Sequence, residues 1–378
     1  MASSAMGVPN SLQDDPVREG RGNREGMGEV LSHVVYILDP LTDPRWPGLV
    51  ERHSAASVFH SRGWLRALQM TYGYEPLAVT TSRPTEPLTN ALLCCVVRSW
   101  VTGDRVVSLP FTDHCEPLVE NITQLRALCA HLDTLRGTQG WKYVELRTRR
   151  AFLGTDKRFR ECNVYQWHRL DLRPSLDALY TRFHKDCIRR RISHAERQGL
   201  RYVEGGNESL VRAFYDLMVM TRLRKQLPPQ PFEWFRNLVT CMGRDVGIRI
   251  AFNGHQPVSG ILTMNHGNTM YYKYGGSDAR FNYLGATPML FWQAIQAAKW
   301  AGMEELDLGR SDTLDGGLIR FKERWGALGV RLTHWRSPAD EAVPSLERLK
   351  MRVAKTVCAS VPDRVLVLAS RLMYRHVG

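Results

Sequence analysis

Two stretches of the sequence follow the same pattern, and this internal duplication is the feature that most restricts the fold. The stretch GWKYVEL begins at Gly140 and the stretch GMEELDL begins at Gly302, which places them 162 residues apart (302 − 140). Each is predicted to be a short strand after a helix, at 124–139 in the first copy and 287–301 in the second, because apolar residues recur there at helical spacing. The glycine after each helix favours a left-handed cap.

Each of these helices is preceded by a predicted meander of three strands. The runs are rich in β-branched and aromatic residues and are separated by turn signals such as TGD and HGN. The strands are predicted at 75–81, 90–100 and 106–113 in the first copy, and at 247–254, 257–265 and 269–276 in the second. The sequence therefore predicts a duplicated α/β unit of three antiparallel strands, a helix and a further strand.

Helices are also predicted before each meander. Residues 61–73 form one in the first copy, and residues 169–175 are interpreted as the linker that ends this unit. The second copy has three predicted helices, at 175–199, 208–225 and 231–243.

Composition limits the class of protein and of partner. A chain of 378 residues with 43% hydrophobic and 24% charged residues is globular and long enough for two domains. The net charge of +13 favours an anionic partner such as phosphate, nucleic acid or an acidic membrane face. The eight cysteines lack CxxC spacing, which indicates free thiols in a reducing compartment. No signal peptide or membrane span is predicted, so a cytoplasmic location is expected.

Four further motifs, together with the order of the elements, carry a resemblance to a known family. They are RRRISHAERQGL (189–200), YYKYGGSD (271–278), GATPMLFWQAIQAAKWAGMEELDLGRSD (285–312) and GLIRFKERWGA (317–327). Between Val34 and Arg336 the chain resembles the Fem-type (FemAB/FemX-like) transferases and the BioF2-like acetyltransferases, which have two GCN5-related N-acetyltransferase (GNAT) units in tandem.

The resemblance implies an α/β fold of tandem duplicated GNAT domains with mixed, mainly antiparallel sheets. The implied domains are a flexible tail at 1–30, a first GNAT-like domain at 31–170, a catalytic second one at 171–338, and basic amphipathic helices at 339–378.

An acyltransferase, either an aminoacyltransferase or an N-acetyltransferase, is the activity that the resemblance implies. It would move an activated acyl group to an amine of a peptidoglycan or polysaccharide precursor. The co-substrate would be aminoacyl-tRNA or acyl-coenzyme A, with no permanently bound cofactor. The alternatives are a coenzyme A-dependent N-acyltransferase acting on a sugar or small-molecule amine, and a non-catalytic protein that binds tRNA or other anions.

The sequence departs from the family pattern at the coenzyme A loop, and it lacks the motifs of other catalytic classes. The coenzyme A loop [QR]xxGx[GA] is not matched, because Arg280 and Gly285 lie one residue too far apart, although a helix start near Thr287 can still bind an anion. No G-x-S-x-G or Cys/His nucleophile motif is present. No metal site is expected, because adjacent polar residues such as Asp113 and His114 do not easily converge on one ion.

Lys322 directly follows Phe321 in a late segment that is predicted to be an amphipathic helix. The pair is similar to the catalytic Phe-Lys pair of the family. The resemblance implies that Phe321 walls the donor or acceptor site and that Lys322 faces the oxyanion or the departing ribose oxygen. A fixed ammonium in a cleft that excludes water suits this task, because it stabilises charge that develops in the transition state. The alternative is a solvated lysine beside core aromatic residues.

The densest basic run lies in the helix predicted at the start of the second unit. At helical spacing Lys185 and Arg189 share one face, while Arg190 and Arg197 share another. Guanidinium groups suit phosphate, so this run is predicted to hold the diphosphate of a nucleotide-linked or lipid-linked precursor. The resemblance assigns this role to Arg189, and Arg66 is the candidate for another phosphate contact. The alternative is a solvated helix face.

Polar residues at strand ends are predicted to line a cleft between the two units. Asp113 and His114 follow the third strand of the first unit, where either can accept a proton from an attacking amine or cap the loop. Lys273 alternates with its tyrosine neighbours and is expected to face away from them. Asp307 is expected to be a structural anchor. The predicted lining is Asp113, His114, Lys273, Tyr274, Asp307 and Arg310.

From Ser345 onward, two short amphipathic helices are predicted, separated at Pro362. Seven basic residues against two acidic ones give this segment a charge of +5. Such an end can lie on the anionic inner face of a membrane, where lipid-linked precursors are found. The alternative is that it packs on the second domain. The oligomeric state is left open.

Overall fold

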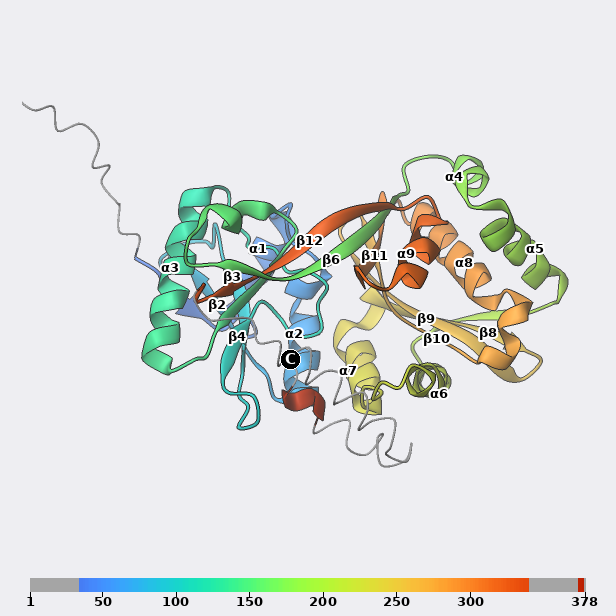
Figure 1. Ribbon diagram of the computed structural model, residues 1–378, viewed down its shortest axis with the longest axis horizontal. Coiled ribbons are helices and arrows are strands. Elements are labelled where there is room, and N and C mark those ends of the chain that lie inside the picture. The colour runs from blue at the N-terminus through green and yellow to red at the C-terminus, as the bar shows by residue number, and fades with distance from the viewer. Residues whose placement is uncertain (1–33, 340–372, 377–378) are drawn as a thin grey trace, which may run out of the picture. The chain divides into compact units, whose positions relative to one another are not determined.

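The computed structural model describes residues 34–339 and 373–376, and the structural unit that contains them begins at Val34. The first half of this unit contains the meander, the helix and the following strand that the sequence predicts (Figure 1). Its elements are β1 (Tyr36–Leu38), α1 (Trp46–Arg52), α2 (Arg62–Tyr72), β2 (Glu75–Thr80), β3 (Leu92–Val97), β4 (Arg105–Val107), α3 (Ile122–Gln139), β5 (Val144–Thr148) and β6 (Arg160–Asp171).

The second half repeats this arrangement with additional helices at its start. Its elements are α4 (Leu176–Arg182), α5 (Arg190–Arg197), β7 (Arg201–Gly205), α6 (Glu208–Arg224), α7 (Phe232–Met242), β8 (Val246–Asn253), β9 (Gln256–His266), β10 (Thr269–Ser277), α8 (Ala286–Trp300), β11 (Glu305–Asp312), α9 (Gly316–Glu323) and β12 (Leu328–Ser337). The predicted duplication of an α/β unit is therefore confirmed.

Local sequence explains where the main helices begin and end. The side chain of Asn121 accepts a hydrogen bond from the backbone N–H of Gln124 and so caps the start of α3. Gly140 and Gly302 have φ of 69° and 73°, which confirms the left-handed caps predicted after α3 and α8.

The strands of the described residues join one twelve-stranded mixed sheet, in the order β1-β2-β3-β4-β5-β12-β6-β11-β10-β9-β8-β7. Only two neighbouring pairs, β4–β5 and β10–β11, run parallel; the other pairs are antiparallel. The fold is thus the mixed, mainly antiparallel α/β architecture that the resemblance implies.

The strands β6 and β12 cross between the two halves and pair with each other (Figure 1). In addition, β12 pairs with β5 of the first half, and β6 pairs with β11 of the second. Each half therefore donates its last strand to the other. The sequence did not predict these strands, and the presumed linker at 169–175 includes the end of β6.

Two predicted elements were wrong in their extent. The strand expected at 106–113 ends at Val107, and the chain then turns through Leu109 and Phe111, which have positive φ of 73° and 60°. The helix expected at 175–199 is broken, because Phe183 and His184 have extended ψ values. A π-helical turn at Lys185–Arg189 then leads into α5.

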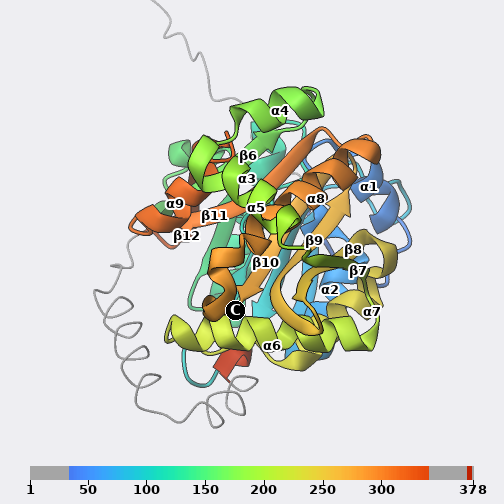
Figure 2. The ribbon, with the colours of Figure 1, turned by 90° about the vertical axis from the view of Figure 1, so that its right-hand side faces the viewer.

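Aromatic side chains form much of the core. In the second half Trp325 packs edge-to-face on Phe183 with ring centroids 4.9 Å apart, and it also contacts Phe291 of α8 at 5.4 Å. Between the halves Trp64 of α2 packs on Trp234 of α7 at 5.2 Å. Helices α6, α7 and α8 lie against the strands of the second half in the side view (Figure 2).

Several predictions concern residues outside the described ones. The tail at 1–30 and most of the segment 345–378 lie there, as does Cys358. Of the C-terminal segment, Met373–His376 is helical, and the Tyr374 hydroxyl accepts a hydrogen bond from Arg222 and donates one to the carbonyl of Pro228. The seven described cysteines are free thiols. Among the described helices, none has the length and apolar character needed to cross a membrane.

Replacing Trp325 by alanine is expected to lower the free energy of unfolding by about 3–5 kcal/mol, because the side chain is only 1% exposed and its loss leaves a cavity. Trp300→Ala is the matched control: this tryptophan is 76% exposed, so its loss should change stability by less than about 0.5 kcal/mol. Chemical denaturation of both variants gives the comparison, and equal losses would contradict this account of the core.

Candidate active site

The side chain of Lys322 points from α9 into the protein and is 2% exposed. Its ammonium group donates hydrogen bonds to the backbone carbonyls of Gly309, at 2.8 Å, and Arg310, at 3.0 Å. Helix α9 is held at its start by Asp315, whose side chain accepts from the backbone N–H of Leu318. The alternative of a solvated surface lysine is therefore excluded.

A β-bulge in β11 supplies the carbonyls that Lys322 binds. The register between β11 and β6 shifts between Asp307 and Arg310, and Gly309 has φ of 69°. A bulge leaves its extra residue unpaired in the ladder, so its polar groups need other partners. The carboxylate of Asp307 accepts the N–H of Gly309 at 2.7 Å, and Lys322 satisfies the carbonyls.

Burial lowers the pKa of Lys322 to about 8, against the opposing effect of the nearby carboxylates of Asp113 and Asp307. The side chain is therefore still mostly an ammonium at neutral pH. An ammonium has three N–H donors, and two of them are held by the bulge. Phe321, beside it, is half-buried and packs on Phe291 of the core with ring centroids 5.4 Å apart.

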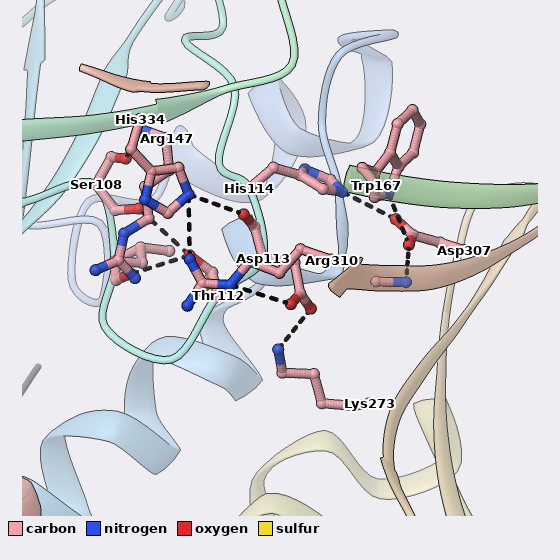
Figure 3. A network of polar contacts seen from close by, with 12 residues as sticks. Ser108, Thr112, Asp113, His114, Arg147, Trp167, Lys273, Asp307, Arg310 and His334 are labelled. Atoms are coloured by element: carbon pink, nitrogen blue, oxygen red, sulfur yellow. Dashed lines mark hydrogen bonds and ion pairs between the residues drawn. The ribbon is translucent and has the colours of Figure 1, made fainter. Parts of the chain in front are cut away.

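Asp113, Lys273 and Arg310 form a partly buried charged cluster at the junction of the two halves (Figure 3). The Lys273 ammonium lies 2.6 Å from one Asp113 oxygen, and the Arg310 guanidinium lies 3.8 Å from the other. Burial raises the pKa of Asp113, but the opposing effect of the Lys273 and Arg310 charges is larger. The net pKa is lowered, and the carboxylate stays ionised.

The predicted direction of Lys273 was wrong because of a second bulge. The β9–β10 register shifts between Tyr272 and Tyr274, so Lys273 is the bulged residue and simple alternation does not apply. Its ammonium lies 5.9 Å from the ring centroid of Tyr274 and 5.3 Å from that of Phe59. Both rings can stabilise the charge.

His114 and Asp307 form a buried pair rather than an exposed lining (Figure 3). The His114 Nε2 lies 2.9 Å from Asp307, and the indole N–H of Trp167 donates to the other Asp307 oxygen at 2.8 Å. Asp307 thus joins the first half, β6 and the bulge of β11. This is the anchoring arrangement that was expected of it.

Sequence reasoning missed a second buried carboxylate, Glu145 of β5. It accepts from Arg147 at 3.0 Å and from Arg336 of β12 at 2.8 Å, and His334 lies 3.7 Å away. The His334 ring also contacts Arg310 at 3.3 Å, which connects this group to the Asp113 cluster (Figure 3). The sequence did not predict β12, and Arg336 reaches Glu145 through the pairing of β5 with β12.

His168 of β6 was also missed. It is fully buried, and neither ring nitrogen has a hydrogen-bond partner among the described residues. Burial and the nearby charge of Lys322 lower its pKa to about 4, so the imidazole is neutral. It lies opposite the Gly309 bulge in the β6–β11 ladder.

The basic residues predicted to bind phosphate line one surface pocket of about 600 Å³. They were expected on two helix faces, but the π-helical turn has more residues per turn than an α-helix and brings them to one side. Arg66 is not among the lining residues and lies on the exposed side of α2. The pocket is lined by Tyr180, Lys185, Arg189, Arg190, Ser193, His194 and Arg197.

The start of α8, where an anion could meet free N–H groups, is covered on one side by α5. Gly285 has φ of 76°, and a Cβ at this position would overlap the carbonyl oxygen of Arg191. The Arg191 guanidinium also donates to the carbonyl of Asn282 at 3.1 Å. Within the described part of the chain, no group of three or more His, Cys, Asp or Glu residues is arranged to hold a metal ion.

Comparisons with known proteins support the resemblance. Residues 182–323 match a family model described as an acetyltransferase (GNAT) domain, which supports the prediction of an acyltransferase. A comparison with curated proteins finds no significant match.

Solved structures share the fold across most of the chain. FemX is 13% identical with a TM-score of 0.64, and the match covers 83% of this chain and 99% of FemX. A conserved protein of unknown function from Bacteroides thetaiotaomicron is 11% identical with a TM-score of 0.54, covering 81% and 100%. The C-terminal domain of a putative lysylphosphatidylglycerol synthetase from Agrobacterium fabrum is 12% identical with a TM-score of 0.51, covering 83% and 95%.

Residues 182–323 therefore match a GNAT-type acetyltransferase domain, and most of the chain has the mixed α/β fold that it shares with FemX, consistent with a Fem-like tandem GNAT.

Proposed function

We propose that this protein transfers an activated acyl or aminoacyl group to an amine of a cell-envelope precursor. Three observations support the proposal: the match to an acetyltransferase domain, the Fem-like fold, and the similarity to a structure named as a putative lysylphosphatidylglycerol synthetase. The observation that carries the mechanism is the buried ammonium of Lys322, held on the bulge of β11 inside the matched domain.

In the proposed reaction the neutral amine nitrogen attacks the carbonyl carbon of the donor. The bond from that carbon to the ester oxygen or thioester sulfur breaks, and the amine loses a proton while the leaving group gains one. The third N–H of Lys322 is free of the bulge and donates to the oxyanion or to the leaving atom. Such a donor acts strongly because the site is buried and the local dielectric constant is low.

The basic pocket on α5 is proposed to hold the anionic part of the acceptor. It combines Lys185, Arg189, Arg190 and Arg197. Within the described part of the chain, Arg190 is the one of these that forms an ion pair, with Asp186 at 2.8 Å. Arginine side chains can bind a diphosphate through paired hydrogen bonds. This pocket suits a nucleotide-linked or lipid-linked precursor.

The second candidate is a coenzyme A-dependent N-acyltransferase, because GNAT domains use acyl-coenzyme A as co-substrate. The packing of α5 on the start of α8 favours a donor whose phosphates lie elsewhere, such as aminoacyl-tRNA. Parallel incubation with charged tRNA and with acyl-coenzyme A, each with an amine-bearing envelope precursor, tests the choice. Consumption of charged tRNA that ribonuclease abolishes supports the first donor, and consumption of the thioester alone supports the second.

Lys322→Met is expected to reduce the transfer rate by about 10²–10³, the usual cost of losing one donor to an oxyanion. The matched control is Lys142→Met, since Lys142 is exposed in the first half. Turnover numbers and thermal unfolding are measured for both. A folded Lys322→Met protein with wild-type turnover would refute the mechanism.

Transfer is expected to fall as the pH rises through about 8, because Lys322 then loses its proton. Asp113 raises the pKa of Lys322, so Asp113→Asn should move this falling limb to lower pH. The profile of kcat against pH, with a check that the variant is folded, gives the answer. If the pH at which kcat falls is the same in Asp113→Asn as in the wild type, Lys322 is not the group that causes the fall.

Arg189→Ala is expected to raise KM for the anionic acceptor by about tenfold, since charge-assisted hydrogen bonds contribute about 1.5–3 kcal/mol each. Added salt should raise the same KM in the wild type by screening. Arg236→Ala is the control, because this arginine is exposed on α7. An unchanged KM in Arg189→Ala, with no response to salt, would remove the phosphate role.

A further inference from the structure

A second basic pocket lies beside α9, apart from the residues that line the α5 pocket. It has a volume of about 340 Å³. The residues that line it are Arg182, His184, Arg320, Glu323 and Arg324. Three guanidinium groups and an imidazole thus face one carboxylate.

This pocket is built by the core rather than by chance surface contacts. Arg182 and His184 flank Phe183, which is buried, while Arg324 precedes Trp325, which is also buried. The two buried rings pack edge-to-face with centroids 4.9 Å apart. The backbone N–H of His184 donates to the carbonyl of Arg324 at 2.8 Å. These contacts fix the end of α4 against the end of α9 and hold the basic side chains around one space.

The three arginines keep their hydrogen-bonding capacity. Among the described residues, no side-chain hydrogen bond or ion pair joins Arg182, Arg320 or Arg324 to a partner, whereas exposed arginines such as Arg98 and Arg169 pair with a carboxylate. Like charges held close together repel each other unless an anion lies between them. Guanidinium groups form paired hydrogen bonds to phosphate oxygens. Among the described residues, no Phe, Tyr or Trp ring lines the pocket, and its cationic groups suit a phosphate group.

Helix α9 joins this pocket to the candidate active site. Arg320, Glu323 and Arg324 share the outer face of the helix at spacings of three and four residues. Lys322 lies on its inner face with its ammonium on the bulge of β11. A phosphate bound in the pocket is therefore held by the same short helix that positions the lysine.

We propose that this pocket, lined by Arg182, Arg320 and Arg324, binds a phosphate group of the acyl donor. The assignment to the donor rests on the proposed function, in which the α5 pocket takes the acceptor. Both candidate donors, charged tRNA and acyl-coenzyme A, carry phosphates, so the shared chemistry is phosphate recognition.

Direct binding tests the pocket without any transfer activity. Calorimetric titration with inorganic pyrophosphate is carried out on the wild type, Arg320→Ala/Arg324→Ala, Arg189→Ala/Arg190→Ala, and the control Arg126→Ala/Arg236→Ala. Each pair removes two positive charges, and the control arginines are exposed elsewhere. Each pocket variant should lose one set of sites, with affinity there weakened at least about tenfold, and the control should keep both. Equal binding by Arg320→Ala/Arg324→Ala and the control would overturn the proposal.

Steady-state kinetics then tests the assignment to the donor. Arg320→Ala/Arg324→Ala should raise KM for the donor and leave KM for the acceptor unchanged, while Arg189→Ala should do the reverse. Adenosine 3′,5′-bisphosphate and uncharged tRNA are compared as inhibitors of the wild type, and the one that loses potency in the variant identifies the source of the phosphate. A rise in KM for the acceptor alone would overturn the assignment. If the wild type transfers nothing from either donor, the proposed function fails. Whether the pocket binds phosphate is tested separately by the titration with pyrophosphate.

Discussion

The exchange of β6 and β12 between the two halves brings together several buried polar groups of the candidate site. Because β12 pairs with β5, Arg336 reaches Glu145, although the two residues are 191 positions apart in the chain. Because β6 pairs with β11, Trp167 reaches Asp307. Without these crossings each half would leave a sheet edge open, and exposed edges invite pairing with other chains. The exchange closes the edges and encloses the polar residues between the halves.

Burying so many charged groups costs free energy unless each one is paired. Asp113 is paired with Lys273, Glu145 with two arginines, and Asp307 with His114 and two N–H donors. Replacing buried ion pairs by apolar residues is often neutral for stability, so a network of this kind is more readily explained by function than by stability. Perturbed pKa values in a buried cluster of this type are typical of functional sites.

β-Bulges position the two lysines of the candidate site, Lys273 and Lys322. Lys273 is the bulged residue of β10, and Lys322 binds the carbonyls that the bulge of β11 leaves unpaired. Two neighbouring strands of the second half thus depart from regular ladders at the places where an ammonium group is held. On the outer side of α9, Arg320 and Arg324 extend this arrangement to the surface. One helix therefore connects the buried Lys322 with the basic pocket that is proposed to bind phosphate.

The duplication, the meanders, the cap glycines and the basic run near Arg189 could be predicted from the sequence, because these depend on periodicity and spacing within a few residues. The pairing of β6 and β12 could not be predicted, since these strands mix polar and apolar residues and contact both halves of the fold. Single-residue bulges at Lys273 and Gly309 reverse side-chain direction, which alternation along a strand cannot foresee. Burial of Lys322 also depends on packing of α9 against distant strands, and that contact has no signal in local sequence.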